Sequence, residues 1–536
     1  MDTAIDPATQ HVRDEASRRR TFAIISHPDA GKTTLTERFL LLGGAIQEAG
    51  AVKARAGRRS ATSDWMALEQ QRGISITSTV LQFPYRGHTL NLLDTPGHRD
   101  FSEDTYRTLT AADAAIMVLD VAKGIEAQTL KLFEVCKARG LPVLTFFNKC
   151  DRPGRDPLEL LDEVQRKIGL RPTPVTWPVG DPGDFQGVID RRTHDLVSYE
   201  RISRGGALAA TEEIVPAEDA AKRLGRVWEE AMEGVGLLDA IEANHDQETF
   251  LAGETSPLFV GSALTTFGVR MLLDAIVDYA PAPGARPNAE GEQREIDAPF
   301  SGFVFKVQAG MDRNHRDRVA FVRVNSGRFE RGMVATHEPS GKPFATKYAA
   351  TVFGNERETV EESYPGDIVG LVNANDVRVG DTLFGGSVPV RFPTIVTFAP
   401  ELFATARPKD VGRFKQFRKG VAQLAEEGVV QVLRDDRTGD SAPIVAAVGR
   451  MQFEVFIWRL ENDFGAPSVL EGTPYKVARR TDAESAEAMK NERHVRVLTR
   501  HDGVLLAMFE TEFWLKRLQD EHPELTLDAI VADRHQ

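Results

Sequence analysis

Short apolar runs alternate with amphipathic stretches over the first half of the chain, from Thr21 to Tyr279. Four of these runs end in polar segments, and they are Thr21–Ile25, Thr89–Leu93, Val143–Phe147 and Leu258–Gly261. A short apolar run is typical of a buried strand, and an amphipathic stretch is typical of a surface helix. Their alternation predicts a doubly wound α/β sheet, in which ligands bind at the carboxyl ends of the strands.

The pattern changes in the second half of the chain. From Phe300 to Phe384, short β-like runs are separated by Gly and Asp turns, which predicts a β-barrel. From about Pro393 onward helix and strand patterns are mixed, which predicts an α+β domain. Its expected elements are a helix with Phe414, Phe417, Val421 and Leu424 on one face, a strand at Ile444–Val448 and a helix at Met451–Leu460.

The chain of 536 residues is too long for one hydrophobic core, so three or four domains are expected. Pro281–Pro287 is a linker by composition, and the long interval between Asn148 and Ser262 predicts an inserted subdomain within residues 152–257. We therefore expect a multidomain fold with these limits: 1–20 a polar N-terminal tail, 21–280 a P-loop α/β domain with the insertion, 281–299 a linker, 300–390 a β-barrel domain, and 391–536 an α+β C-terminal domain.

The first polar segment has the context of a phosphate-binding P-loop, because it lies between a predicted strand and a predicted helix. Its residues are Ser26, His27, Pro28, Asp29, Ala30, Gly31, Lys32, Thr33 and Thr34. Backbone N–H groups of such a loop bind phosphates, Lys32 neutralises phosphate oxygens, and the Thr33 hydroxyl can ligate Mg²⁺. Ser26 departs from the usual pattern, which has Gly at this position.

Three further segments follow predicted strands in the order that a guanine-nucleotide switch requires. They are Asp94, Thr95, Pro96, Gly97 and His98, then Asn148, Lys149, Cys150 and Asp151, and finally Ser262, Ala263 and Leu264. Asp94 can hold Mg²⁺ through water, and the Gly97 N–H can contact the γ-phosphate. The Asp151 carboxylate can accept two hydrogen bonds from guanine, whereas adenine would leave it unpaired. Each segment alone could be an ordinary strand-end turn, but four in order favour a GTP site.

These motifs resemble the GTP-binding domain of translational GTPases. Three stretches resemble, more specifically, the bacterial peptide chain release factor 3 family, namely the phosphate loop, Ser63–Tyr85 and Met311–Val319. The resemblance extends over nearly the whole chain from about Thr21.

The resemblance implies roles for individual residues. His98 would be the catalytic residue that points at the attacking water on the ribosome. Thr33, Asp94 and a switch hydroxyl would hold Mg²⁺; relatives have Thr where this chain has Ser75, and Thr77 offers a second hydroxyl two residues later. Asp29 would help to hold a monovalent cation, and Pro28 replaces the valine of the elongation-factor pattern.

Composition narrows the class of protein. Residues with basic side chains number 66 and acidic residues 79, so the net charge of −13 argues against a sequence-wide nucleic-acid coat. No apolar run approaches the ~20 residues of a membrane span, and the polar N-terminus lacks a signal-peptide core, so a cytoplasmic protein is expected. The two cysteines, Cys136 and Cys150, are expected to be small core residues rather than a zinc site or a disulfide.

The resemblance also implies an activity. The chain would be a ribosome-stimulated GTPase of translation termination, not codon-specific, that drives the decoding release factor off the ribosome after peptide release and hydrolyses GTP for its own departure. Its expected cofactors are GTP or GDP and Mg²⁺. Its partners would be ribosomal RNA and proteins and decoding release factors, with no membrane or DNA, and a monomer is expected.

Neighbouring functions fit less well. An elongation factor G would need two further C-terminal domains, but only residues 385–536 follow the predicted barrel, and the helix-rich ending does not suit elongation factor Tu. The Gly-Gly-Gln string of a decoding release factor does not occur. Three alternatives stay open: another translational GTPase, a non-translational P-loop GTPase and a nucleotide-gated binding module that does not hydrolyse GTP.

One segment of the C-terminal part is unusually basic. Residues 407–419 carry six cations, Arg407, Lys409, Arg413, Lys415, Arg418 and Lys419, against the single acid Asp410. The segment is either the solvated face of a helix or a docking surface for ribosomal RNA phosphates, with the loop from Arg313 to Arg318 as the next candidate.

Overall fold

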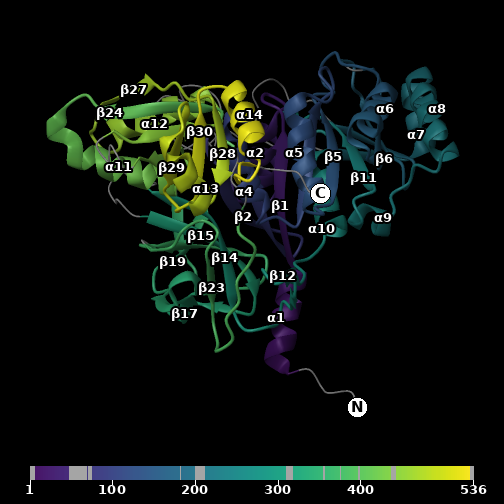
Figure 1. The fold of residues 1–536 in the computed structure, drawn as a ribbon. Helices are drawn as coiled ribbons and strands as arrows, with labels where there is room; N and C mark the ends of the chain where they lie inside the picture. The colour runs from purple at the N-terminus through teal and green to yellow at the C-terminus, as the bar shows by residue number, and fades with distance from the viewer. Residues whose placement is uncertain are drawn as a thin grey trace.

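The computed structural model describes residues 6–46, 69, 75–181, 183–199, 212–309, 318–353, 356–374, 376–395, 399–435 and 442–530. Figure 1 shows the chain running from the purple N-terminal helix through the purple, blue and teal α/β domain and the teal to green barrel to the C-terminal domain, which runs from green to yellow. Residues 63–68 and 70–74 of the predicted switch region, and residues 311–317 of the barrel loop, lie outside the described residues.

The central sheet of the α/β domain contains seven described strands in the order β2-β3-β1-β4-β5-β11-β6. β2 pairs antiparallel with β3, and the remaining pairings are parallel. Their bounds are β1 (Arg19–Ser26), β2 (Thr79–Tyr85), β3 (His88–Asp94), β4 (Ala114–Asp120), β5 (Val143–Asn148), β6 (Arg171–Pro174) and β11 (Thr255–Val260). All four apolar runs that precede the predicted motifs are therefore strands, and their carboxyl ends share one edge of the sheet.

Helices cover both faces of this sheet, as predicted for a doubly wound fold. One face packs against residues of α4, α5 and α6, and the other packs against α2 and α10. The bounds are α2 (Lys32–Leu42), η1 (Arg99–Phe101), α4 (Ser102–Leu109), α5 (Ala127–Ala138), α6 (Pro157–Ile168) and α10 (Val269–Tyr279). Leu35 and Phe39, four residues apart on α2, are fully buried and fix this helix beside the phosphate loop.

A second, antiparallel sheet lies within the interval where the sequence predicts an insertion. Its order is β10-β9-β8-β7 among the described strands, and β6 of the same interval joins the central sheet instead. The bounds are β7 (Thr176–Val179), β8 (Gly187–Asp190), β9 (Asp195–Tyr199), β10 (Glu212–Val215), α7 (Ala217–Leu224), α8 (Arg226–Ala240) and α9 (Gln247–Leu251).

The N-terminal segment differs from the prediction of a polar tail over residues 1–20. Residues Pro7–Ser17 form helix α1, and β1 already begins at Arg19. The helix begins at a proline, which is favourable in the first turn, and buries Val12 and Ala16. Arg13 pairs with Asp297 at 2.6 Å, so the helix packs on the segment before the barrel. The prediction was wrong here because only two apolar residues mark the buried face.

The segment between the α/β domain and the barrel contains a short hairpin of β12 (Arg286–Pro287) and β13 (Gln293–Arg294), within the predicted linker. The main sheet of the β-barrel domain has eight described strands in the order β18-β17-β23-β14-β15-β22-β19-β20, and β16 and β21 pair as a separate two-stranded sheet. The bounds are β14 (Ser301–Ala309), β15 (Arg318–Ser326), β16 (Phe329–Glu330), β17 (Val334–His337), η2 (Glu338–Ser340), β18 (Lys342–Ala345), β19 (Ala349–Phe353), β20 (Glu356–Thr359), β21 (Glu362–Ser363), β22 (Ile368–Val372) and β23 (Thr382–Phe384).

The C-terminal domain has eight described strands in the order β27-β24-β26-β25-β29-β30-β28-β31. The predicted amphipathic helix is α11, and Phe417, Val421 and Leu424 on it are buried. The bounds are β24 (Leu402–Pro408), η3 (Val411–Arg413), α11 (Phe414–Glu426), β25 (Gln431–Arg434), β26 (Ile444–Ala447), α12 (Arg450–Asn462), β27 (Ser468–Gly472), β28 (Val477–Thr481), α13 (Ala483–Ala488), η5 (Met489–Asn491), β29 (Val495–Arg500), β30 (Leu505–Phe509), α14 (Glu512–Glu521) and β31 (Asp528–Ala529).

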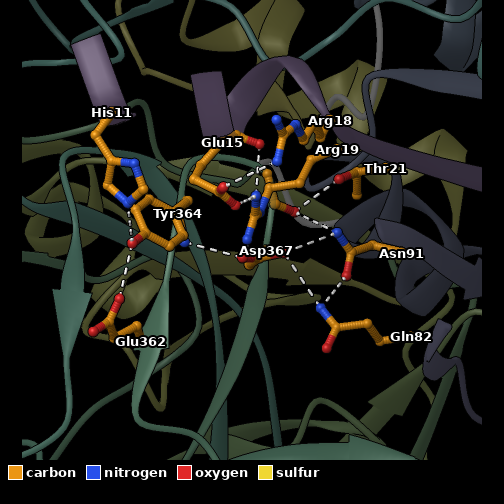
Figure 2. Close-up of polar contacts among 11 residues, drawn as sticks. His11, Glu15, Arg18, Arg19, Thr21, Gln82, Asn91, Glu362, Tyr364 and Asp367 are labelled. Carbon is orange, nitrogen blue, oxygen red and sulfur yellow. Dashed lines mark hydrogen bonds and ion pairs between the residues drawn. The ribbon is translucent and has the colours of Figure 1, made fainter. Parts of the chain in front are cut away.

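A buried polar network joins the α/β domain to the barrel, and Figure 2 shows it around Asp367. The Asp367 carboxylate accepts hydrogen bonds from Arg19 Nε at 2.7 Å, Gln82 Nε2 at 3.3 Å and Asn91 Nδ2 at 3.4 Å. The Thr21 hydroxyl donates to the neighbouring Gly366 carbonyl at 2.7 Å. Because an uncompensated buried charge costs several kcal/mol, about 3–5 for a broken pair, this network holds the two domains in one arrangement.

The cysteines are buried, as expected, at Cys136 and Cys150. Burial raises the pKa of each thiol to about 12, so both remain protonated. Within the described ranges, no helix combines the length and the apolar character that crossing a bilayer requires.

Candidate functional site

The phosphate loop connects β1 to α2, in the strand, loop and helix context that the sequence predicts. Two of its residues adopt the left-handed backbone region, Asp29 with φ +65° and Gly31 with φ +98°. Gly31 is the N-cap of α2, so the N–H groups of the first helical turn face the loop. Lys32 Nζ donates to Asp94 Oδ1 at 2.5 Å, which places the cation of the loop beside the carboxylate that ends β3.

Asn148 joins the end of β5 to two other segments of the site. Its side-chain Nδ2 donates to the Ala30 carbonyl at 2.7 Å, and its Oδ1 accepts from the Ala263 N–H at 2.8 Å and the Lys149 N–H at 2.9 Å. A single amide thus ties the phosphate loop to the segment that follows β11. Both acceptor positions of Oδ1 and one N–H of Nδ2 are used in this way, so the side chain holds these segments together.

Lys149 extends across the same cavity. Its ammonium donates to the Asp29 carbonyl at 2.5 Å and to Asp120 Oδ2, at the end of β4, at 2.8 Å. Burial raises the pKa of the Asp120 carboxyl, but hydrogen bonds from Lys149 and the Ala122 N–H outweigh it and hold this pKa below its usual range. Asp120 is therefore ionised and anchors the lysine.

The segment after β3 places a glycine and a histidine beside the phosphate loop. A Cβ on Gly97 would lie 3.6 Å from Pro28 Cα, so the two backbones approach closely. His98 follows, and its Nδ1 accepts a hydrogen bond from the Asp100 N–H at 3.2 Å. About a third of the His98 side chain is exposed, and the residue lines the cavity.

The two candidate switch hydroxyls lie in different surroundings. Ser75 lines the cavity, whereas Thr77 is not among its lining residues. The Thr77 hydroxyl and N–H both donate to Glu69 Oε1, at 3.3 and 3.1 Å. Ser75 is therefore the better placed of the two to reach a metal ion.

These segments enclose a cavity of about 400 Å³. Its lining contains the following sequence-predicted residues: 26–29 and 31–34 of the phosphate loop, Ser75, Gly97, His98, Asn148, Lys149, Asp151, Ala263 and Leu264. Arg152 also lines it, with Nε 3.9 Å from Asp151 Oδ2. Sequence reasoning did not select Arg152, although its position directly after Asp151 was the available signal.

Five predicted site residues do not line this cavity, but they bond to residues that line it or to the neighbouring backbone. Asp94 pairs with Lys32, and the Ala30 carbonyl accepts from Asn148. The remaining three make hydrogen bonds with neighbouring segments. Thr95 Oγ1 donates to the Ile24 carbonyl, and the Pro96 carbonyl accepts from the Thr105 hydroxyl. The Ser262 N–H donates to the Phe267 carbonyl.

Two buried acceptor oxygens, one on Asp151 in the cavity lining and one on Asp94 behind that lining, fit a guanine nucleotide with Mg²⁺. Among the described residues, Asp151 Oδ1 and Asp94 Oδ2 are buried and accept no hydrogen bond. Such acceptors are costly unless a ligand donates to them or binds them, and guanine N–H groups and a hydrated cation have the required chemistry. Burial lowers the pKa of the His27 imidazole, so this ring adds no charge beside the phosphate loop.

Family comparisons agree with this arrangement. Residues 17–282 match the model "Elongation factor Tu GTP binding domain", residues 299–386 match "Elongation factor G domain 2", and residues 392–519 match "Class II release factor RF3, C-terminal domain". The first match contains every segment of the cavity described above.

Curated relatives match over nearly the full chain. A protein of Synechococcus elongatus named peptide chain release factor 3 is 47% identical over 526 residues, covering 97% of this chain and 94% of the relative. The protein of the same name in Gloeobacter violaceus is 49% identical, covering 96% and 98%. A crystal structure from Thermus thermophilus, 24% identical with a TM-score of 0.69, covers 91% of this chain and 72% of its own and has the same fold. The chain therefore belongs to the peptide chain release factor 3 family.

Proposed function

We propose that this protein is a ribosome-dependent GTPase of translation termination that promotes dissociation of the decoding release factor after peptide release. It reads no codon itself, and it hydrolyses GTP to GDP and phosphate for its own departure from the ribosome. The observation that carries the proposal is a single cavity lined by both the base-recognition residue Asp151 and the loop of His98, in a chain of this family.

Each part of the cavity has a distinct task in this proposal. The phosphate loop binds the phosphates with backbone N–H groups and Lys32, and Gly97 approaches the γ-phosphate with its own N–H. Asp151 selects guanine through its buried acceptor oxygen, and Asn148 holds the loops in register. His98 orients the attacking water, a contribution of positioning rather than of covalent chemistry.

Thr33, Ser75 and Asp94 are the residues that would hold Mg²⁺. The ion would neutralise negative charge on the phosphates during hydrolysis. Asp94 lies beside Lys32, so one carboxylate can position both the cation of the loop and a hydrated metal. The base-binding residues and the phosphate loop thus follow different strands of one sheet, and the proposed metal ligands come from the start of α2, the segment before β2 and the end of β3.

The partners proposed are the ribosome, through its RNA and proteins, and the decoding release factors, with the protein acting as a monomer. Action on ribosomes corresponds to a cytoplasmic location. For the domain limits we propose the ranges predicted from the sequence, 21–280, 300–390 and 391–536, with the N-terminal helix α1 added to the first.

The proposal is tested on ribosomes halted at a stop codon and carrying a fluorescent decoding release factor after peptide release. Adding this protein with GTP should accelerate loss of the fluorescent factor from the ribosome by at least about tenfold, an effect of about 1.4 kcal/mol or more. The matched control is the Asp151→Asn variant supplied with GTP, which should not accelerate release. A dissociation rate that the wild-type protein leaves unchanged would contradict the proposal.

A further inference from the structure

Asp100 joins the loop of His98 to the C-terminal domain. Its Oδ2 accepts a hydrogen bond from the Met451 N–H at 2.8 Å, across a separation of 351 residues in sequence. Met451 lies in the first turn of α12, where backbone N–H groups have no partner within the helix. A carboxylate from the GTPase domain thus satisfies a helix end of the C-terminal domain and also complements its dipole.

The start of α12 is shaped for this contact. Gln452 Oε1 accepts from the N–H groups of Val448 at 2.7 Å and Gly449 at 3.3 Å, so the helix caps these two groups itself. A Cβ on Gly449 would lie 1.9 Å from Asp100 Cγ. The carboxylate can reach the Met451 N–H only because residue 449 has no side chain.

The same residue also fixes His98. The Asp100 N–H donates to His98 Nδ1 at 3.2 Å, and Asp100 Oδ1 lies 3.5 Å from that nitrogen. Both contacts are made to the same ring nitrogen, so they fix the orientation of the His98 ring. The position of His98 therefore depends on where Asp100 is held.

Apolar packing strengthens the link. Phe101, the next residue, is 6% exposed and packs in one cluster with Ile76 and with Val455 of α12. The rings of His98 and Phe101 lie 6.2 Å apart, so the histidine rests against a side chain that is itself seated on the C-terminal domain. The barrel is attached through other groups, namely the network around Asp367, Lys306, which donates to the Ser78 carbonyl, and Arg323, which pairs with Asp113.

We propose that Asp100 is a positioning residue for GTP hydrolysis, which makes the orientation of His98 depend on the docking of α12 against the GTPase domain. The inference rests on the proposed function, because it assigns His98 to the hydrolytic step. In this arrangement the C-terminal domain acts as part of the switch. Any event that moves α12 changes the catalytic loop without touching the nucleotide.

The test measures single-turnover GTP hydrolysis on terminating ribosomes with four full-length variants. Asp100→Ala and Gly449→Ala disrupt the contact from opposite domains. Each should lower kcat by about tenfold, while the GTP affinity and the KM for ribosomes stay unchanged. The reason is that misplacing a positioned group slows only the chemical step. Asp100→Asn keeps an acceptor oxygen for the Met451 N–H and should stay within about threefold of wild type. Gly472→Ala is the matched control, because its Cβ would meet nothing within 4 Å.

Two readouts separate this role from a merely structural one. The double variant with Asp100→Ala and Gly449→Ala should be no slower than either single variant, because both remove one contact. Amide exchange at Met451 in the ribosome-free protein should accelerate in Asp100→Ala but not in Gly472→Ala.

Wild-type kcat in both Asp100→Ala and Gly449→Ala, with normal ribosome stimulation in the parent protein, would overturn the positioning role and leave the proposed function intact. A parent protein without ribosome stimulation would instead contradict the proposed function. The exchange measurement on the free protein would then still report whether Asp100 holds α12, and an unchanged Met451 rate would overturn that contact as well.

Discussion

Gly31 and Asn148 approach so closely that no side chain fits between them: a Cβ on Gly31 would lie 2.3 Å from Asn148 Nδ2. The Asn148 amide cannot retreat without losing its hydrogen bonds to Ala30, Lys149 and Ala263. The loop between β1 and α2 therefore packs tightly against the segment that follows β5, and this contact requires glycine at position 31.

Gly31→Ala should weaken binding of both GTP and GDP by about tenfold or more, because steric displacement of Asn148 adds to the strain of a left-handed alanine. Equilibrium titration with a fluorescent nucleotide measures the effect. Gly140→Ala is the control, since Gly140 has φ +63° but open space around it. Equal nucleotide affinities for the Gly31 and Gly140 variants would show that the contact with Asn148 does not contribute to nucleotide binding.

Asp151→Asn should weaken GTP binding and admit xanthosine triphosphate, because an amide can donate to the 2-oxo group of xanthine, which a carboxylate would repel. The buried Asp151 Oδ1, without a hydrogen bond among the described residues, is the atom that the guanine N–H would satisfy. A competition assay between the two triphosphates measures the preference, and the exposed Asp181→Asn serves as the control. An unchanged preference for GTP would remove the base-selecting role of Asp151.

Ser75→Ala should weaken the apparent affinity for Mg²⁺ in the presence of GTP, whereas Thr77→Ala should leave this affinity nearly unchanged. The reason is their placement, since Ser75 lines the cavity and the Thr77 hydroxyl donates to Glu69. Titrating Mg²⁺ against bound fluorescent GTP gives the apparent metal affinity of each variant. The opposite order of effects would identify Thr77 as the ligand.

The sequence predicted the strand ends of the site well, because each motif follows a local apolar run that becomes a strand of the central sheet. It did not predict which motif residues face the nucleotide cavity. Thr95 and Ser262 were placed in the site because they belong to the motifs, yet their bonds support neighbouring backbone. The contacts Gly31–Asn148 and Asp100–Met451 join segments far apart in sequence, so no local sequence pattern predicts them.

His98→Ala should slow ribosome-stimulated hydrolysis by about 10²-fold or more while leaving nucleotide and ribosome binding nearly intact, since water positioning acts in the transition state. Single-turnover kinetics measure the rate. His88→Ala, at the opposite end of β3, is the matched control. Turnover within about threefold of wild type would mean that another residue orients the water.

Reversal of Arg413, Lys415 and Lys419 to Glu should weaken ribosome binding and flatten its salt dependence, because cations that meet RNA phosphates bind by releasing counterions. All three are exposed: Arg413 ends η3, and Lys415 and Lys419 lie on α11, two residues before and after the buried Phe417. Sedimentation with ribosomes at several salt concentrations measures both quantities, and reversal of Lys131, Lys137 and Arg166 is a control of equal charge change.

Binding with an unchanged affinity and salt slope would make this segment an ordinary solvated helix face. The second candidate for docking is the loop from Arg313 to Arg318. Its last residue, Arg318, pairs with Glu426 at 2.7 Å and is mostly buried, while residues 313–317 lie outside the described part of the chain.

The rate of GTP hydrolysis by the full-length protein, with and without ribosomes that hold a decoding release factor at a stop codon, tests the central claim most directly. We expect slow hydrolysis by the free protein and an acceleration of at least about 10²-fold on these ribosomes, because the ribosome completes the positioning of His98. A hydrolysis rate that is the same in the presence and absence of ribosomes would contradict the assignment of this protein to translation termination.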